Sequence, residues 1–251
     1  MIGLPAGRAD FRAGGIKDTD TCGAEHDVYR GLDRRPVMNY NKDEFEKHLK
    51  AVGVGDDLIG LIVNAPYQQS EDDKQDNANY CAAVMARCDE LLEFNQRADM
   101  MLSRACCKGG FRLNNAKMIA RDHGDKTLEE KLELLGQQKY MGHPRLTERG
   151  EIYTGTCAGS GPPENLRCSC WRFGGKFPSE GLMPLSYCLC CGGHFVFHYQ
   201  KALGLKLRVK QVVTSVFADP PQYCSFILEI LGEMPRPKRG RKPRTLTTGT
   251  D

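Results

Sequence analysis

The chain has 251 residues, of which 40% are hydrophobic and 27% are charged, a composition typical of globular proteins. No segment approaches the roughly 20 apolar residues of a membrane span, and the first residues hold no apolar run long enough for a secretory signal. We therefore expect a cytoplasmic protein with no membrane partner. Its twelve cysteines are then expected to stay as thiols, bind metal or react, because a disulfide framework is rare in a reducing compartment.

The helical part of the chain is predicted over residues 41–140, after an irregular segment at 1–40 that is rich in glycine and charge. A helix is expected from a cap at Asn41, and the apolar spacing over 77–107 indicates one long helix that ends at the glycine pair 109–110. Further predicted helices cover 113–123 and 127–138, the second with Thr127 and Glu130 at capping-box spacing.

The character of the sequence changes near Gly142, and residues 141–234 form a predicted cysteine-rich region that combines strands with one helix. The predicted strands are 150–156, 165–173, 205–217 and 223–231. A helix is expected over 192–204, between the second and third strands. This order predicts an α+β fold in which the helical half packs on a C-terminal antiparallel sheet that carries a cysteine-rich hairpin and helix.

Two closely spaced cysteine pairs carry the strongest chemical signal. Side chains two apart on a strand share a face, so Cys168 and Cys170 are expected to point the same way. If 187–190 are also extended, Cys188 and Cys190 form a second pair, and four sulfurs meet at one point. Such a thiolate set suits zinc, and also iron–sulfur chemistry. We predict zinc as the cofactor and an iron–sulfur cluster as the alternative, since C-x-C is not a usual cluster-binding run.

Two further residues are candidate metal ligands. Cys224 alternates with apolar residues on the last predicted strand, so it is either a ligand reaching the site or a small buried hydrophobe. His198 lies four residues after His194 on one helical face, which is metal-ligand spacing. A pair of histidines on a partly exposed face without a metal is the alternative.

A nucleophile is also predicted. Cys191 directly precedes the expected helix, whose dipole and free amides acidify a thiol at that position. His194 lies three residues on and is the candidate proton acceptor, which makes Cys191 and His194 a predicted catalytic pair. Cys106 and Cys107 are expected in the core, with a place in the same pocket or a separate reactive pair as the alternatives. The candidate walls of a small-molecule pocket, each of which is also a candidate core residue, are Trp171, Phe173, Phe195 and Phe197.

The C-terminal part resembles a known family. The segment PLSYCLCCGGHFVFHYQKALGLKLRVKQVVTSVF, followed by a turn and YCSFILEI, resembles cysteine-rich prokaryotic proteins grouped near L-2-amino-thiazoline-4-carboxylic acid hydrolases. The last part is also similar to 4-vinyl-reductase-type ligand-binding domains. The resemblance covers about residues 140–231. It implies that Cys188, Cys190 and Cys224 match the family's cysteines, with Cys168 and Cys170 as partners, and that zinc lies beside a pocket for a small molecule.

The net charge of +3 comes from the end of the chain. Residues 235–251 hold six basic residues and one acidic residue, and the rest of the chain has a net charge of −2. We predict a basic disordered tail, in which 235–244 (PRPKRGRKPR) is the one segment suited to nucleic acid, because it resembles the arginine-rich arms that enter the minor groove. A solvated tail without a partner is the alternative.

Three functions follow from these patterns. The first is a zinc-binding protein with a small-molecule pocket. The second is a hydrolase of a small sulfur- or nitrogen-containing compound, which uses the metal or the Cys191 thiolate with His194. The third is a redox or iron–sulfur protein. The sequence contains no phosphate-binding glycine loop, serine-hydrolase elbow or H-E-x-x-H helix, so nothing favours those classes.

Overall fold

The computed structural model describes residues 40–105, 108–155 and 174–235, together with the single residues 166, 168, 170 and 172. All of these belong to one compact unit, Pro36–Asp251, so the helical region and the cysteine-rich region are not separate units. The predicted irregular segment and the basic tail lie outside the described residues, except for residues 40 and 235.

The first half of the described chain is helical, as predicted. Its helices are α1 (Tyr40–Ala51), α2 (Asp56–Val63), α3 (Asp73–Leu91), α4 (Phe94–Arg104), α5 (Gly110–Asp122) and α6 (Leu128–Gly136). The single long helix expected over 77–107 is wrong, because Leu92 adopts an extended conformation and Glu93 starts α4 through a capping box with Gln96. The capping box of Thr127 and Glu130 at the start of α6 is confirmed.

The second half contains a four-stranded antiparallel sheet, which confirms the α+β fold. Its strands are β1 (Arg145–Leu146), β2 (Ile152–Gly155), β3 (Leu205–Thr214) and β4 (Ser225–Glu233). The order is β1-β2-β4-β3, so β4 lies between β2 and β3, with Ile152 opposite Leu228. The strand expected over 165–173 is not found at its described positions, and the short β1 was not predicted.

The segment that carries the clustered cysteines is helical. A 3-10 turn, η3 (Leu185–Cys188), leads directly into α7 (Leu189–Leu203), which ends at Gly204 in the left-handed conformation. The expectation that 187–190 are extended is therefore wrong, and the helix begins three residues earlier than predicted. Pro184 precedes the first turn, and a short apolar run such as YCLC fits a buried helix as well as a strand.

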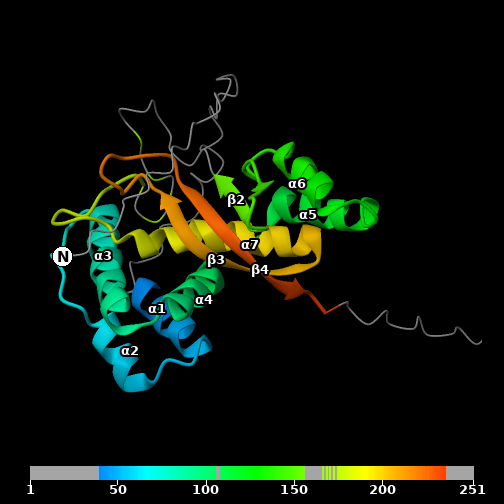
Figure 1. The fold of residues 1–251 in the computed structure, drawn as a ribbon. Helices are drawn as coiled ribbons and strands as arrows, with labels where there is room; N and C mark the ends of the chain where they lie inside the picture. Colours follow the sequence, from blue (N-terminus) through cyan, green and yellow to red (C-terminus); the bar gives the residue numbers. More distant parts are fainter. Residues whose placement is uncertain are drawn as a thin grey trace, which may run out of the picture. The chain divides into compact units, whose positions relative to one another are not determined.

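Helix α7 lies between the sheet and the N-terminal helices (Figure 1). Two adjacent glycines permit this close packing on both sides. A Cβ atom on Gly192 would lie 2.7 Å from Cγ2 of Val209 in β3, and one on Gly193 would lie 2.7 Å from the Cα atom of Leu102 in α4. Because neither position has room for a side chain, the N-terminal part of α7 is held tightly against both layers.

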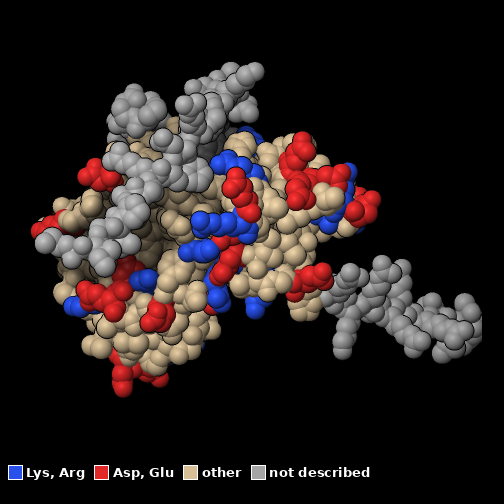
Figure 2. Space-filling model, viewed as in Figure 1, with Lys and Arg blue, Asp and Glu red and all other residues tan. Residues whose placement is uncertain are grey.

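A buried polar link joins the far part of α7 to the sheet. The Tyr199 hydroxyl is completely buried, donates to the main-chain carbonyl of Met141 and lies 2.9 Å from the Thr154 hydroxyl in β2. Among the described residues, no helix is both long and apolar enough to cross a lipid bilayer. Figure 2 shows basic and acidic side chains interspersed over one face of the described residues.

Candidate functional site

The cysteines that were predicted to meet at one point fall into two separate groups in the structure. Because Cys188 and Cys190 lie in a helical segment, residues two apart are rotated by about 200° and point to different sides. Cys188 faces Cys224 and Ser215, whereas Cys190 lies near Arg104 and Tyr187. Within the described part of the chain, no three histidine, cysteine, aspartate or glutamate residues are arranged to hold a metal ion.

The first group is the dithiol pair, Cys188 and Cys224. The Cys188 sulfur lies 3.0 Å from the Ser215 hydroxyl oxygen and forms a hydrogen bond with Cys224. Cys224 also accepts from the Val216 amide and interacts with the Ser215 hydroxyl. The Cys188 contact, followed by these donors, lowers the pKa of Cys224 to about 7 against the opposing effect of burial. The same contact, together with burial, raises the pKa of Cys188.

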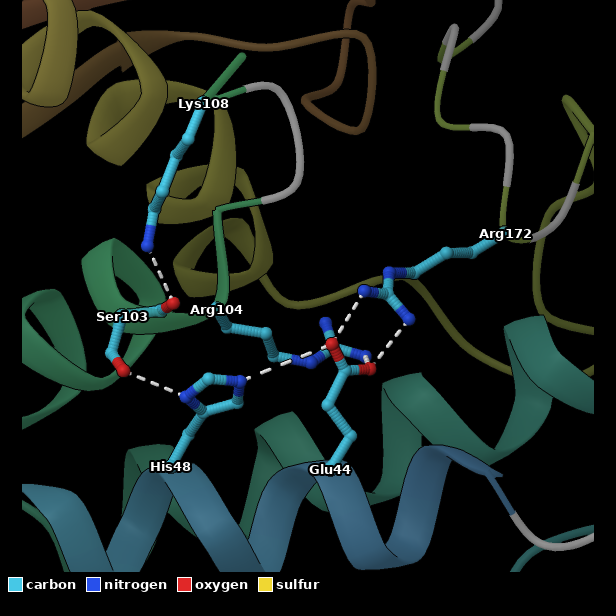
Figure 3. Close-up of polar contacts among 6 residues, drawn as sticks. All are labelled: Glu44, His48, Ser103, Arg104, Lys108 and Arg172. Carbon is cyan, nitrogen blue, oxygen red and sulfur yellow. Dashed lines mark hydrogen bonds and ion pairs between the residues drawn. The ribbon is translucent and has the colours of Figure 1, made fainter.

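The second group surrounds two buried arginines, and we call it the guanidinium cluster: Glu44, His48, Ser103, Arg104, Lys108 and Arg172 (Figure 3). Helix α1 presents Glu44 and His48 one turn apart. Arg172 donates two hydrogen bonds to the Glu44 carboxylate, at 2.6 and 2.7 Å. His48 Nδ1 lies 2.7 Å from the Ser103 hydroxyl, and burial lowers the pKa of His48, so its imidazole is neutral at pH 7.

Arg104 is the exceptional member of this cluster. Its side chain is 0% exposed, and none of its three guanidinium nitrogens donates a hydrogen bond to an oxygen among the residues that the structure describes, although the guanidinium interacts weakly with the Cys81 thiol. Its nearest carboxylate oxygen, Oε2 of Glu44, is 3.6 Å away and already accepts from Arg172. One face of the guanidinium stacks on Phe45, with 4.0 Å between its carbon and the ring centre.

Thiols and a phenol also lie near Arg104. The Cys170 sulfur lies 3.4 Å from the Tyr187 hydroxyl, whose ring centre is 5.8 Å from the Arg104 guanidinium carbon. Cys81 and Cys190 also lie close enough to Arg104 to interact with its charge. Burial raises the pKa of Cys81 and of Tyr187, so both groups are protonated at pH 7 and add no negative charge.

The predicted catalytic pair lies on the first turns of α7. Cys191 is half-buried in the first turn, and Arg112 Nη1 from α5 lies 2.9 Å from His194 Nε2. Because a guanidinium can only donate, His194 accepts at this nitrogen, and the lone pair that a proton or a metal would need is engaged. His198 is completely buried, and its ring packs edge-on against His194 at 5.3 Å between ring centres.

The remaining predicted site residues are distributed as follows. Cys168 is half-buried and packs against the core, and Phe195 is a core residue in contact with Phe226 and Tyr199. Phe197 on α7 is half-buried, and the Lys108 ammonium lies 5.9 Å from the centre of its ring. The residues predicted for the pocket or core that lie outside the described residues are Cys106, Cys107, Trp171 and Phe173.

An open pocket of about 390 Å³ lies elsewhere on the described surface, beside Arg97, Ser186 and Lys210. It is lined by none of the predicted site residues. Arg104 was also missed by the sequence analysis, although it follows Met101 by three residues and continues the buried face of α4. A charged residue in phase with an apolar stripe is the signal that pointed to it.

Comparison with known protein families, curated proteins and solved structures gives no match to this chain. The resemblance to the thiazoline-carboxylate hydrolases and vinyl-reductase-type domains therefore stays a prediction. So does nucleic-acid binding by residues 235–244, since all but the first of them lie outside the described residues.

Proposed function

We propose that the protein binds a small molecule through an anionic group, most simply a carboxylate, that pairs with the guanidinium of Arg104. The observation that carries this proposal is a completely buried arginine from which no described oxygen accepts a hydrogen bond, with a carboxylate oxygen at 3.6 Å and a weakly interacting thiol beside it. Native proteins rarely leave such donors unsatisfied, because a buried charged group without partners costs several kcal/mol. A bound anion would accept hydrogen bonds from the Arg104 guanidinium, and the buried arginine would then serve as a ligand-binding group.

The charges of the cluster support an anion rather than a cation. Two buried guanidinium groups, Arg104 and Arg172, share the single carboxylate of Glu44. The ammonium of Lys108, in the same cluster, donates to the Ser103 carbonyl at 2.7 Å. Burial raises the pKa of the Cys81 thiol and of the Tyr187 phenol beside Arg104, so both stay protonated at pH 7. The local excess is therefore positive, which attracts an anion and repels a metal cation.

The geometry of arginine favours a planar oxyanion. A guanidinium presents its donors along its edge, in a fork that matches two oxygens of a carboxylate or phosphate. Because Phe45 stacks on one face of Arg104, the edge remains the part suited to a ligand. The nearby thiols and aromatic rings would surround the uncharged part of a small ligand with apolar and polarizable groups.

A carboxylate ligand also fits the resemblance noted for the C-terminal part, because the substrate named for those hydrolases is a carboxylic acid that contains sulfur and nitrogen. Hydrolysis of such a compound, through a metal or through Cys191 with His194, stays part of the proposal as its second form. The contact between His194 and Arg112 favours the first form, in which binding is the function.

Thermal unfolding of the full chain with added anions tests the proposal. The probes are L-2-amino-thiazoline-4-carboxylic acid, L-cysteine, phosphate and sulfate, each compared with chloride at equal ionic strength. At least one probe is expected to raise Tm saturably, since a ligand present at 100 times its Kd stabilises a protein by about 2.7 kcal/mol. The shift should vanish in Arg104→Met and persist in the control Arg121→Met, whose arginine is exposed and paired with Asp122.

The same variant separates a ligand site from a structural ion pair. If Arg104 serves a ligand, the unliganded Arg104→Met protein should keep its stability within about 1 kcal/mol, because replacing a buried charge by an apolar side chain is often neutral or favourable. If Arg104 instead supports the fold through Glu44, its removal should cost about 3–5 kcal/mol. That larger loss, or probe shifts that are equal in the wild type and Arg104→Met, would overturn the proposal.

A further inference from the structure

We propose that Cys188 and Cys224 form a redox-active dithiol, which a small hydroperoxide oxidises to a disulfide and a dithiol reduces again. This inference concerns the dithiol pair and does not depend on anion binding at Arg104.

The fold brings the two thiols together from separate elements. Cys188 ends η3 at the start of α7, and Cys224 directly precedes β4. Both are free thiols, only 4% and 3% exposed, and hydrogen bonded to one another. A disulfide between them would link the start of α7 to the start of β4, and the two sulfurs already face each other.

Ser215 fixes the geometry around both sulfurs. Its hydroxyl oxygen lies 3.0 Å from the Cys188 sulfur and accepts from the Phe217 amide at 3.0 Å. Its carbonyl accepts from the amides of Ala218 and Gln222, at 3.1 and 3.0 Å. The turn between β3 and β4 thus holds a hydroxyl and the Val216 amide against the dithiol pair, where they can support a thiolate.

A comparison with Cys88 shows that burial alone does not place hydrogen-bond donors around a cysteine sulfur. Cys88 is completely buried on α3, and burial raises its pKa to about 12. Cys224 is buried nearly as deeply but receives the Cys188 thiol, the Val216 amide and the Ser215 hydroxyl. These three donors around the Cys224 sulfur stabilise a negative charge there and so favour the thiolate, which is the nucleophilic form.

The oxidation takes two balanced steps. The Cys224 thiolate attacks one oxygen of the hydroperoxide, the O–O bond breaks, and with one proton the products are the Cys224 sulfenic acid and water or an alcohol. The Cys188 sulfur then attacks the sulfenic sulfur, forms the S–S bond and releases a second water, which takes the Cys188 proton. A dithiol reverses the change by two thiol–disulfide exchanges and becomes a cyclic disulfide itself. The low exposure of both sulfurs selects a small oxidant.

Hydrogen peroxide and peptide mapping test the inference on the full chain. After peroxide treatment, blocking of remaining thiols and unfolding, trypsin should release Cys188 within residues 177–201 and Cys224 within 211–238. We expect a cross-link between these two peptides that dithiothreitol removes. It should be lost in Cys188→Ser and Cys224→Ser and kept in Cys190→Ser and Cys191→Ser, which share the first peptide with Cys188.

A trapping experiment identifies the residue that reacts first. In Cys188→Ser the sulfenic acid on Cys224 has lost its partner, so dimedone should label peptide 211–238 more than in the wild type. The control Cys88→Ser should behave as the wild type, and Arg104→Met should keep the cross-link. The absence of the cross-link in the wild type, or a cross-link that survives Cys188→Ser, would overturn the inference.

Discussion

Arg172 and Glu44 are 128 residues apart in the chain, and two short hydrogen bonds join the guanidinium of the first to the carboxylate of the second. This fork is 2.6 and 2.7 Å long and leaves no strong acceptor for Arg104, which approaches the same carboxylate no closer than 3.6 Å. The arrangement therefore pairs Arg172 closely with Glu44 and leaves Arg104 without a carboxylate oxygen at hydrogen-bond distance among the described residues.

The first prediction concerns this shared carboxylate. Glu44→Gln removes the negative charge that faces both arginines and should lower the free energy of unfolding by about 3–5 kcal/mol, since it leaves buried charges uncompensated. Urea unfolding measures the loss. The control Glu90→Gln, which breaks an exposed pair with Arg87, should stay within about 0.5 kcal/mol. A loss below 1 kcal/mol in Glu44→Gln would show that Glu44 does not neutralise the cluster.

The second prediction concerns the contact between α7 and α4. Gly193→Ala places a methyl group 2.7 Å from the Leu102 Cα atom, and a main-chain atom cannot move aside alone. We expect a loss of about 1–3 kcal/mol, typical of overpacking, by urea unfolding. The control Gly60→Ala lies in helix α2 with nothing within 4 Å and should stabilise the protein by about 0.5–1 kcal/mol. Equal effects of the two variants would refute the close packing.

The third prediction concerns the polar link through Tyr199. Tyr199→Phe keeps the ring but leaves the Met141 carbonyl and the Thr154 hydroxyl without this partner, which should cost about 1–3 kcal/mol. Tyr223→Phe removes a hydroxyl from a side chain that is 46% exposed and serves as the control. Thermal unfolding of both variants beside the wild type gives the comparison, and a neutral Tyr199→Phe would contradict the role of this link.

Much of the fold followed from local signals in the sequence. The capping box at Thr127, the helical spacing before it and the period-two pattern of β3 and β4 each have a physical cause within a few residues. The break between α3 and α4 was missed because the apolar spacing continues through Leu92 while the Glu93 capping box stops the helix. Strand and helix were confused at 187–190 because four apolar residues fit either period.

The candidate site depends more on tertiary contacts than the fold does, so less of it could be predicted from the sequence. Cys188 and Cys224 were both named as metal ligands, and the structure places them together, although Cys190 turns toward Arg104 instead. Pairing across 36 residues could not be read from local spacing. The phase of Arg104 with the apolar stripe of α4 indicates burial, but its surroundings of Phe45, Glu44 and Tyr187 come from tertiary contacts that local spacing does not predict.

The fourth prediction tests the metal hypothesis taken from the sequence. Elemental analysis of protein prepared without oxygen should find zinc in the wild type and less of it in Cys170→Ser and Cys190→Ser if these residues are ligands. Cys88→Ser, on the apolar stripe of α3, is the control and should leave the zinc content unchanged. Metal-free wild-type protein, or equal zinc in all four proteins, would exclude the hypothesis, while an absorption spectrum distinguishes an iron–sulfur cluster.

The last prediction is a dependence of stability on pH that arises from the dithiol pair. The folded protein holds the pKa of Cys224 at about 7, chiefly through the Cys188 thiol, whereas an unfolded cysteine titrates near about 8.5. Between these values the unfolded chain binds more protons than the folded one, so stability rises with pH, by up to about 1.4 kcal/mol per unit. Above them the rise ends, because Cys224 is then ionised in both states, and stability falls because the raised pKa of Cys188 leaves the folded chain with more bound protons than the unfolded chain.

The measurement is the unfolding free energy of the wild type minus that of Cys224→Ala, in reducing buffer from pH 6 to 9. The titratable groups that act on the pair are Cys188, Cys224 and Cys191, the last through its charge on Cys188. The difference should grow from pH 7 to about 8.5 and shrink as pH falls through 7, because the Cys224 thiolate is then lost. The same difference for Cys88→Ala should not rise over that interval and should fall as pH approaches and passes about 8.5, since burial raises the pKa of Cys88 to about 12 and its thiol then ionises only in the unfolded chain. A flat curve for Cys224→Ala would show that the folded chain does not stabilise this thiolate.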